Sequence, residues 1–228
     1  MAEQFFTEDT LAFLTELALH NRREWFNDNK QSYENYVRNP ALEFIDAMEG
    51  RMEKISPCFP AIPKKSGGSL MRIYRDVRFS RDKSPYKTNI GIQFRHKAGK
   101  DVHAPGYYLH IEPTQVFVAA GMWHPPGSAL AAIRQAIDEH PDAWRKAVGN
   151  AAFKRNFQLA GDSLKRPPRG FSTDHALIED LKRKDFIAVR DLELKTVLKK
   201  DFPDKVAGFF DKGTPFMKFL CKAIGVPF

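Results

Sequence analysis

The sequence predicts an α+β protein in which N-terminal and C-terminal helices pack on one face of an antiparallel β-meander. Apolar residues recur at helical spacing before residue 56 and again after residue 127. Between residues 90 and 121, apolar and polar residues alternate with a period of two, as in strands with one buried face. No repeat or linker separates two cores, so we expect residues 1–228 to form a single domain.

The first third of the chain is predicted to be helical. Thr7 is a suitable N-cap, because its side-chain oxygen can accept a hydrogen bond from the free amides of a first turn. Asn21 interrupts the pattern, and a second helix with an aromatic stripe is expected over 25–37. Pro40 suits the first position of a third helix, which should end before Pro57.

Three strands with short polar connections are expected to form the meander. Their apolar residues occupy alternate positions, so they should share the face that packs on the helices. These residues are Ile90, Ile92 and Phe94; Tyr107, Leu109 and Ile111; and Val116, Val118 and Ala120. A polar turn over 96–106 is expected to join the first two strands.

The last hundred residues are expected to add more helices and one further strand. Proline and glycine positions divide this region into segments. The expected elements are a helix capped by Ser128 and running to about Glu139, a helix opened by Pro141, a helix over 174–184, a strand over 186–191, and a helical stretch over 203–224 that breaks near Gly213.

Composition excludes several classes of protein. Hydrophobic residues make up 43% of the chain and charged residues 28%, which favours a globular protein over a disordered one. The longest nearly apolar stretch, 116–123, is too short to cross a bilayer, and the acidic start after Met1 is unlike a signal peptide. Cys58 and Cys221 are the only cysteines, so we expect no disulfide framework, no structural zinc site and a cytoplasmic location.

The net charge of +8 is concentrated in one segment. Residues 64–101 carry 11 Lys/Arg against 3 Asp/Glu, a net charge of +8, whereas 1–63 carry −5 and 102–228 carry +5. Concentrated positive charge attracts anions. The alternative is a solvated basic surface that binds nothing.

The centre of this segment, 71–79, alternates as a strand would. One face would be apolar and the other would carry arginines with a tyrosine and an aspartate. The apolar face would hold Met71, Ile73, Val77 and Phe79, and the opposite face Arg72, Tyr74, Asp76 and Arg78. Arg75 falls on the apolar face, so it must be paired, or the strand must end there.

Eight residues of the segment form an Arg-x-x-Arg-Asp-x-Arg-Phe pattern followed by Asp-Lys-x-x-Tyr. They are Arg72, Arg75, Asp76, Arg78, Phe79, Asp82, Lys83 and Tyr86. This pattern resembles the signature of the DUF2461 family of bacterial and fungal proteins. Flanking segments around Trp25, 106–113 and 166–171 extend the resemblance over nearly the whole chain. The resemblance implies no particular reaction or ligand.

The basic motif has three interpretations. A guanidinium offers a planar fork of donors, so arginines oriented by aspartates could bind a phosphate-bearing small molecule. The same groups could instead form an Arg–Asp lattice that only locks a turn. The basic segment 64–101 could also associate with nucleic acid, although interspersed acids and missing nucleic-acid motifs disfavour this. The candidate ligand-binding residues are Arg72, Arg75, Asp76, Arg78, Asp82, Lys83 and Tyr86, of which Tyr86 favours a structural role.

His110 and Glu112 are weaker candidates for catalysis. They share a predicted strand face with Tyr108, so His110 could act as a general acid or base oriented by Glu112 or Asp76. The alternative is an exposed His/Glu pair on a solvated face. His124 could join them around a metal ion, but the spacing matches no recognised ligand pattern, so no metal site is predicted and no cofactor is indicated.

Overall fold

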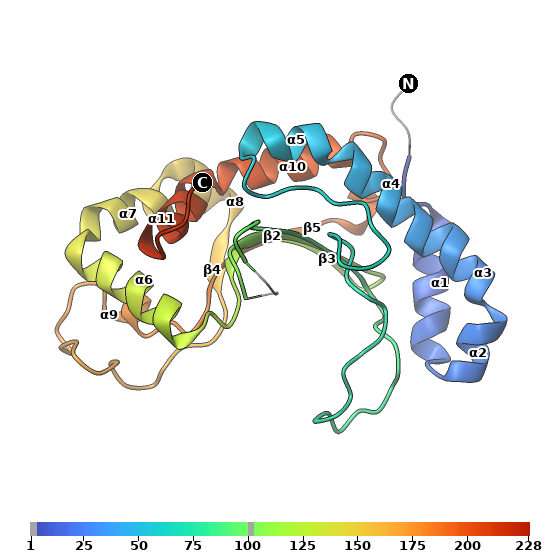
Figure 1. The fold of residues 1–228 in the computed structure, drawn as a ribbon, viewed down its shortest axis with the longest axis horizontal. Helices are drawn as coiled ribbons and strands as arrows, with labels where there is room; N and C mark the ends of the chain where they lie inside the picture. The colour runs from blue at the N-terminus through green and yellow to red at the C-terminus, as the bar shows by residue number, and fades with distance from the viewer. Residues whose placement is uncertain (1–3, 100–102) are drawn as a thin grey trace.

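The computed structural model of the protein describes residues 4–99 and 103–228. Figure 1 shows a curved sheet with helices above it and at both ends. The strands are β1 (Ile90–Arg95), β2 (Gly106–Glu112), β3 (Gln115–Met122), β4 (Gln158–Ala160) and β5 (Phe186–Leu192). The helices are α1 (Glu8–Leu19), α2 (Arg23–Asp28), α3 (Lys30–Tyr33), the π-helix η1 (Glu34–Arg38), α4 (Asn39–Ala47), α5 (Glu49–Ile55), α6 (Gly127–Glu139), α7 (Pro141–Gly149), α8 (Ala151–Asn156), α9 (Ile178–Leu181), the 3₁₀-helix η2 (Leu194–Thr196), α10 (Phe202–Lys212) and α11 (Thr214–Ala223).

The five strands form an antiparallel sheet in the order β1-β2-β3-β5-β4. β1 pairs with β2 so that Gly91 lies opposite His110, and β2 pairs with β3 so that His110 lies opposite Phe117. The predicted meander is therefore confirmed. β5 adds to the outer side of β3, and the short β4, which the sequence pattern did not indicate, pairs with β5. The expected turn over 96–106 includes 100–102, which lie outside the described residues, as do 1–3.

One face of the sheet carries the core. The nine apolar residues predicted for that face are all buried, and they belong to one continuous hydrophobic cluster with residues of the helices. α4 and α10 contact β1 and β3, and Figure 1 shows α4, α5 and α10 on this side of the sheet. Helices from both ends of the chain therefore cover one face, which confirms the predicted α+β class. None of the described helices combines the length and apolar composition needed to cross a bilayer.

Three helix predictions were wrong in their extent. The helix expected over 25–37 is divided at Asn29, where φ is −105° and ψ is 14°, and its last part is the π-helix η1. The helix expected over 174–184 is reduced to α9. Its expected C-terminal part instead pairs with an extended segment, in which Leu164 N–H donates to Lys182 O (2.8 Å) and Asp162 O accepts from Lys184 N–H (2.8 Å). The helix expected from Pro40 to before Pro57 is divided at Met48, where ψ is −12°.

Threonine and proline residues mark the N-termini of α1 and α6. Thr7 is the N-cap of α1, and its N–H donates to the Thr10 hydroxyl (3.1 Å). Ser128 was expected to cap α6, but the helix already begins at Gly127, because Pro126 lies at the cap and its carbonyl accepts from Leu130 N–H (2.9 Å).

Candidate functional site

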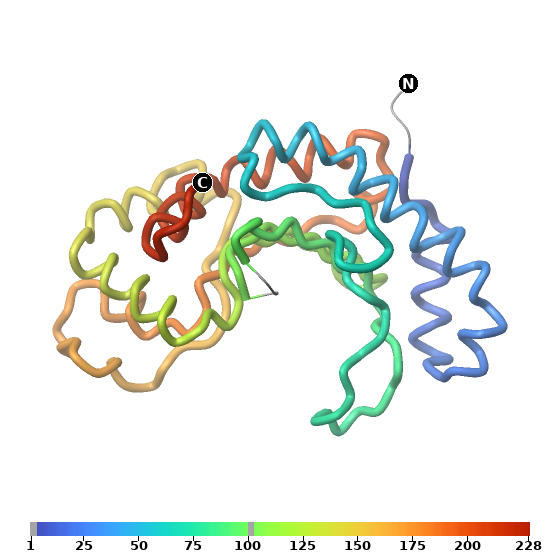
Figure 2. Tube along the Cα trace, in the orientation of Figure 1, coloured from blue at the N-terminus to red at the C-terminus, as the bar shows by residue number. Residues whose placement is uncertain are grey.

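The Arg-rich motif forms an irregular two-stranded ribbon, residues 70–88, that extends from the sheet. Figure 2 shows this stretch leaving the sheet and returning to it on the side away from α5 and α10. Its stem is held by an isolated bridge between Tyr74 and Tyr86 and by two backbone hydrogen bonds, Arg75 N–H to Pro85 O (2.9 Å) and Lys87 N–H to Ile73 O (2.7 Å). The ribbon therefore places both halves of the motif side by side.

The regular strand considered for 71–79 does not form. The alternation survives in part, since Ile73 is buried while Arg72 and Tyr74 are exposed, but Phe79, expected on the apolar face, is 96% exposed. Side chains bond to the local backbone at the outer end: Asp82 accepts from Ser84 N–H at 2.9 Å. Such local bonds compete with strand ladders, and Pro85 has no N–H to donate.

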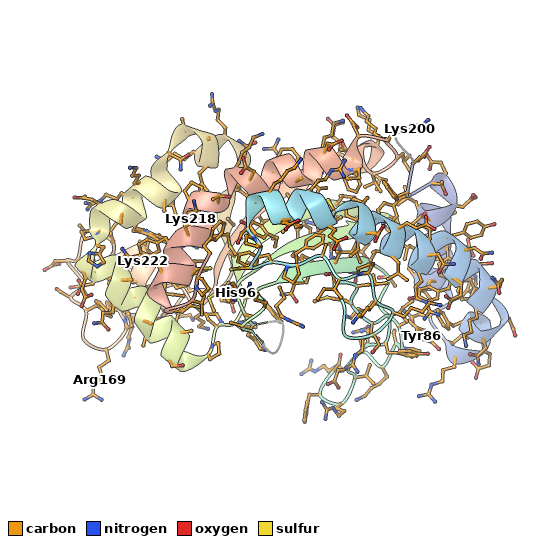
Figure 3. All side chains as sticks on the ribbon, turned by 45° about the horizontal axis from the view of Figure 1, so that its top comes forward. Tyr86, His96, Arg169, Lys200, Lys218 and Lys222 are labelled. Carbon is orange, nitrogen blue, oxygen red and sulfur yellow. The ribbon has the colours of Figure 1, made fainter. Side chains whose placement is uncertain are left out.

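The ribbon is fixed to the N-terminal helices at Tyr86. Asn21, just after α1, donates from Nδ2 to Tyr86 O (3.0 Å), and its Oδ1 accepts from Tyr86 N–H (3.1 Å). The buried Tyr86 ring stacks on Phe26 of α2 with centroids 4.1 Å apart. Figure 3 labels Tyr86 at this junction. Tyr86 thus acts as an anchor, and its partners lie far away in the sequence.

The motif's two aspartates each hold one arginine. Arg78 donates to both carboxylate oxygens of Asp76, from Nε (2.9 Å) and Nη2 (2.7 Å), and this lowers the pKa of Asp76 to about 2. Arg75 is paired with Asp82, which is one of the two outcomes expected for an arginine on the apolar face, and this bond lowers the pKa of Asp82. Arg75 and Arg78 are therefore held by different carboxylates.

Two further candidate residues of the motif, Lys83 and Arg72, form no ion pair with the residues that the structure describes. Lys83 donates from Nζ to Val77 O (2.9 Å), which closes the outer loop of the ribbon. Arg72 is exposed.

A pocket of about 300 Å³ lies where the ribbon meets the end of α1. Most of its wall is polar: the lining residues are Ala18, Asn21, Arg75, Asp82, Ser84, Tyr86, Lys87, Thr88 and Asn89. Lys87 is half-buried there and forms no ion pair within the described chain. Burial, and then the positive charge of Arg72, lower the pKa of the Lys87 ammonium. The pocket therefore contains a cation whose charge the protein leaves unneutralised.

A second polar cluster lies directly behind the pocket wall. His110 Nδ1 lies 3.1 Å from the Tyr108 hydroxyl and 3.3 Å from Asn89 Nδ2, and its Nε2 lies 3.4 Å from Glu112 Oε2. Thr88 donates to the other oxygen of Glu112 (3.0 Å). Thr88 and Asn89 thus belong to both the pocket and the cluster.

His110 and Glu112 are brought together by the strand, whereas Asp76 pairs with Arg78 instead. The His110 side chain is only 15% exposed and stacks on Phe117 with centroids 4.6 Å apart, so it is not on an open solvated face. Burial lowers the pKa of His110, although the neighbouring Glu112 acts in the opposite direction. The ring is therefore held neutral near pH 7.

This environment predicts a pH dependence of stability. An unfolded histidine binds a proton below about pH 6.5, while the folded ring does so only at lower pH, so the unfolded state gains protons first. We expect the free energy of unfolding to fall as the pH decreases from 7.5 to 5.5, and to fall less in His110→Phe, which keeps the stacked ring. Urea denaturation at both pH values measures this, with exposed His140→Phe as the control. Equal losses in wild type and His110→Phe would contradict the assignment.

The third conceivable metal ligand lies elsewhere. His124 follows β3 at the opposite end of the strand pair from Glu112, and its Nδ1 lies 3.0 Å from Asp185 Oδ1. The described residues contain no group of three His, Cys, Asp or Glu side chains placed to hold a metal ion. Cys58 and Cys221 are buried, and burial raises the pKa of Cys221 to about 12, which keeps that thiol protonated.

Six pocket residues were not among the predicted site residues: Ala18, Asn21, Ser84, Lys87, Thr88 and Asn89. Lys87 lies in the basic segment 64–101, so its position in the sequence could have indicated a role in anion binding. Nothing in the sequence links Asn21 to a residue 65 positions later.

A family model described as a conserved hypothetical protein, DUF2461, matches residues 9–219. No curated protein and no solved structure matches the chain.

Proposed function

The chain belongs to the DUF2461 family, and we propose that it binds a phosphorylated or otherwise anionic small ligand in the pocket between the ribbon and α1. The observation that carries the proposal is Lys87. A half-buried ammonium beside another cation is unfavourable in the empty pocket, and an anion would relieve that cost. The pocket volume, about 300 Å³, suits a small ligand.

Other residues that line the pocket offer donors for an anion with several oxygen atoms. Arg75 uses one of its five N–H groups on Asp82, so the guanidinium is oriented and keeps further donors. The Asn89 amide supplies neutral polar atoms on the same wall. Positioned donors of this kind are what phosphate recognition needs.

The cluster behind the wall gives the site a candidate for acid–base chemistry. Neutral His110 can accept a proton, and Glu112 stabilises the charge that it would then carry. Both nitrogens are in contact with protein groups, so a proton would reach the ring through the Tyr108 hydroxyl rather than from the pocket directly.

Ligand binding is tested by titrating inorganic phosphate, nucleoside monophosphates and sugar phosphates while following the thermal midpoint. We expect a phosphate-bearing compound to raise the midpoint of the wild type and Lys87→Met to weaken binding at least tenfold, because a charge-assisted contact is worth about 1.5–3 kcal/mol. Exposed Lys200, which Figure 3 labels near the start of α10 and away from Tyr86, gives the control variant Lys200→Met.

The lattice alternative makes the opposite prediction. If the motif only locks a turn, no phosphate-bearing compound shifts the midpoint of the wild type, and Lys87→Met responds to every titration as Lys200→Met does. That pair of results would reject the proposal.

A further inference from the structure

The outer end of the ribbon is exposed, aromatic and basic. Phe79 is 96% exposed, the highest value among the large hydrophobic residues that the structure describes, and Tyr74 on the stem is 55% exposed. Arg78 stays 76% exposed although it is paired with Asp76, and its guanidinium lies 5.9 Å from the centre of the Phe79 ring. Single exposed apolar residues are common, but two aromatic rings interleaved with arginines are a recognised binding surface.

The charge of the ribbon is strongly positive. Residues 70–88 contain six Lys/Arg and two Asp/Glu, a net +4. Both acids are bound by arginines of the ribbon itself, while exposed Arg72 and Arg81 form no ion pair within the described chain. A polyanion approaching the ribbon therefore meets free cations at the stem and at the tip.

We infer that the ribbon binds single-stranded nucleic acid, with Tyr74 and Phe79 stacking on bases and Arg72, Arg78 and Arg81 contacting phosphates. Stacking tolerates any base, because every base has a π-face, and the cations between the rings match the phosphates between bases. This surface is separate from the pocket: Phe79 and Arg81 are not among the pocket residues.

A linear polymer fits the arrangement better than a membrane does. A bilayer would take up apolar side chains at one depth, but the two exposed rings are separated along the ribbon, one at the bridge with Tyr86 and one in the outer loop. The carboxylates of Asp76 and Asp82 would also have to approach the lipid. Duplex DNA offers no free base faces for the rings, so a single strand is the favoured ligand.

The test is fluorescence anisotropy with a labelled twelve-nucleotide mixed-sequence DNA at low salt, repeated with the RNA and with the duplex. We expect the single strands to bind, and Phe79→Ala to weaken binding about tenfold. Phe79→Leu should lose most of the same affinity, since it stays apolar but has no flat ring. Arg81→Gln should reduce the slope of log K against log salt by about 0.7. The controls are Tyr36→Ala, an exposed tyrosine outside the ribbon, and Lys200→Gln.

Three outcomes would overturn the inference. These are no binding of single strands at low salt, binding that Phe79→Ala leaves unchanged, and a preference for phosphatidylserine vesicles over the oligonucleotide. Phe79 is almost fully exposed, so its replacement leaves the folded core intact, and a thermal midpoint equal to that of the wild type verifies this. Lys87→Met should retain oligonucleotide binding, which separates this inference from the pocket.

Discussion

Tyr86→Ala is expected to lower the free energy of unfolding by about 3–5 kcal/mol, as removal of a buried aromatic ring commonly does. The ring is buried, stacks on Phe26 and lies 5.5 Å from the Tyr74 ring, so its loss leaves a cavity between the ribbon and α2. The hydrogen bonds with Asn21 use only backbone atoms of Tyr86 and remain possible, but without the ring they hold the ribbon weakly. Urea denaturation gives the change in stability.

Two variants separate the ring from other effects. Tyr86→Phe keeps the stacked ring and should cost less than about 1 kcal/mol. Tyr36→Ala removes a tyrosine that is 41% exposed and should change stability by about 0.5 kcal/mol or less. If Tyr86→Ala were as stable as Tyr36→Ala, the ribbon would not be anchored at this position, and the pocket built on that anchor would lose its support.

The alternation of apolar and polar residues predicted the three meander strands well, because it depends only on which face of a strand each residue occupies. A strand with one buried face alternates at every position, and the predicted apolar residues of the three meander strands are all buried. The same parity failed at Phe79. None of the described strands pairs with this part of the chain, and local hydrogen bonds to the carboxylates of Asp76 and Asp82 set the backbone conformation instead.

The candidate site was predictable only where its residues are adjacent in sequence. An arginine on an apolar face indicated that Arg75 is paired or that the strand ends there, and the contact of His110 with Glu112 follows from strand parity. The pocket itself depends on Asn21, whose contact with Tyr86 arises from tertiary packing of helices against the ribbon. A single sequence contains no local signal for such a contact, so Lys87 could be recognised as basic but not as enclosed.

Replacement of Gly121 in β3 is the second substitution for which we expect a large loss of stability. The alternation along β3 indicates only that Gly121 is a small residue on the face away from the helices. Its φ is +132°, a conformation that is essentially restricted to glycine. A Cβ atom there would lie 2.0 Å from the Phe186 carbonyl oxygen of β5. We expect Gly121→Ala to destabilise the protein by about 2–4 kcal/mol, because β3 and β5 must separate or the backbone must change conformation.

Gly208→Ala is the matched control, because it makes the same chemical change with the opposite expected sign. Gly208 lies inside α10, and a Cβ atom there has no neighbour within 4 Å. Alanine restricts the unfolded chain more than glycine does, so this variant should gain about 0.4–1 kcal/mol. Chemical denaturation of both variants measures the difference. Equal stability would mean that β3 does not approach the Phe186 carbonyl as closely as described.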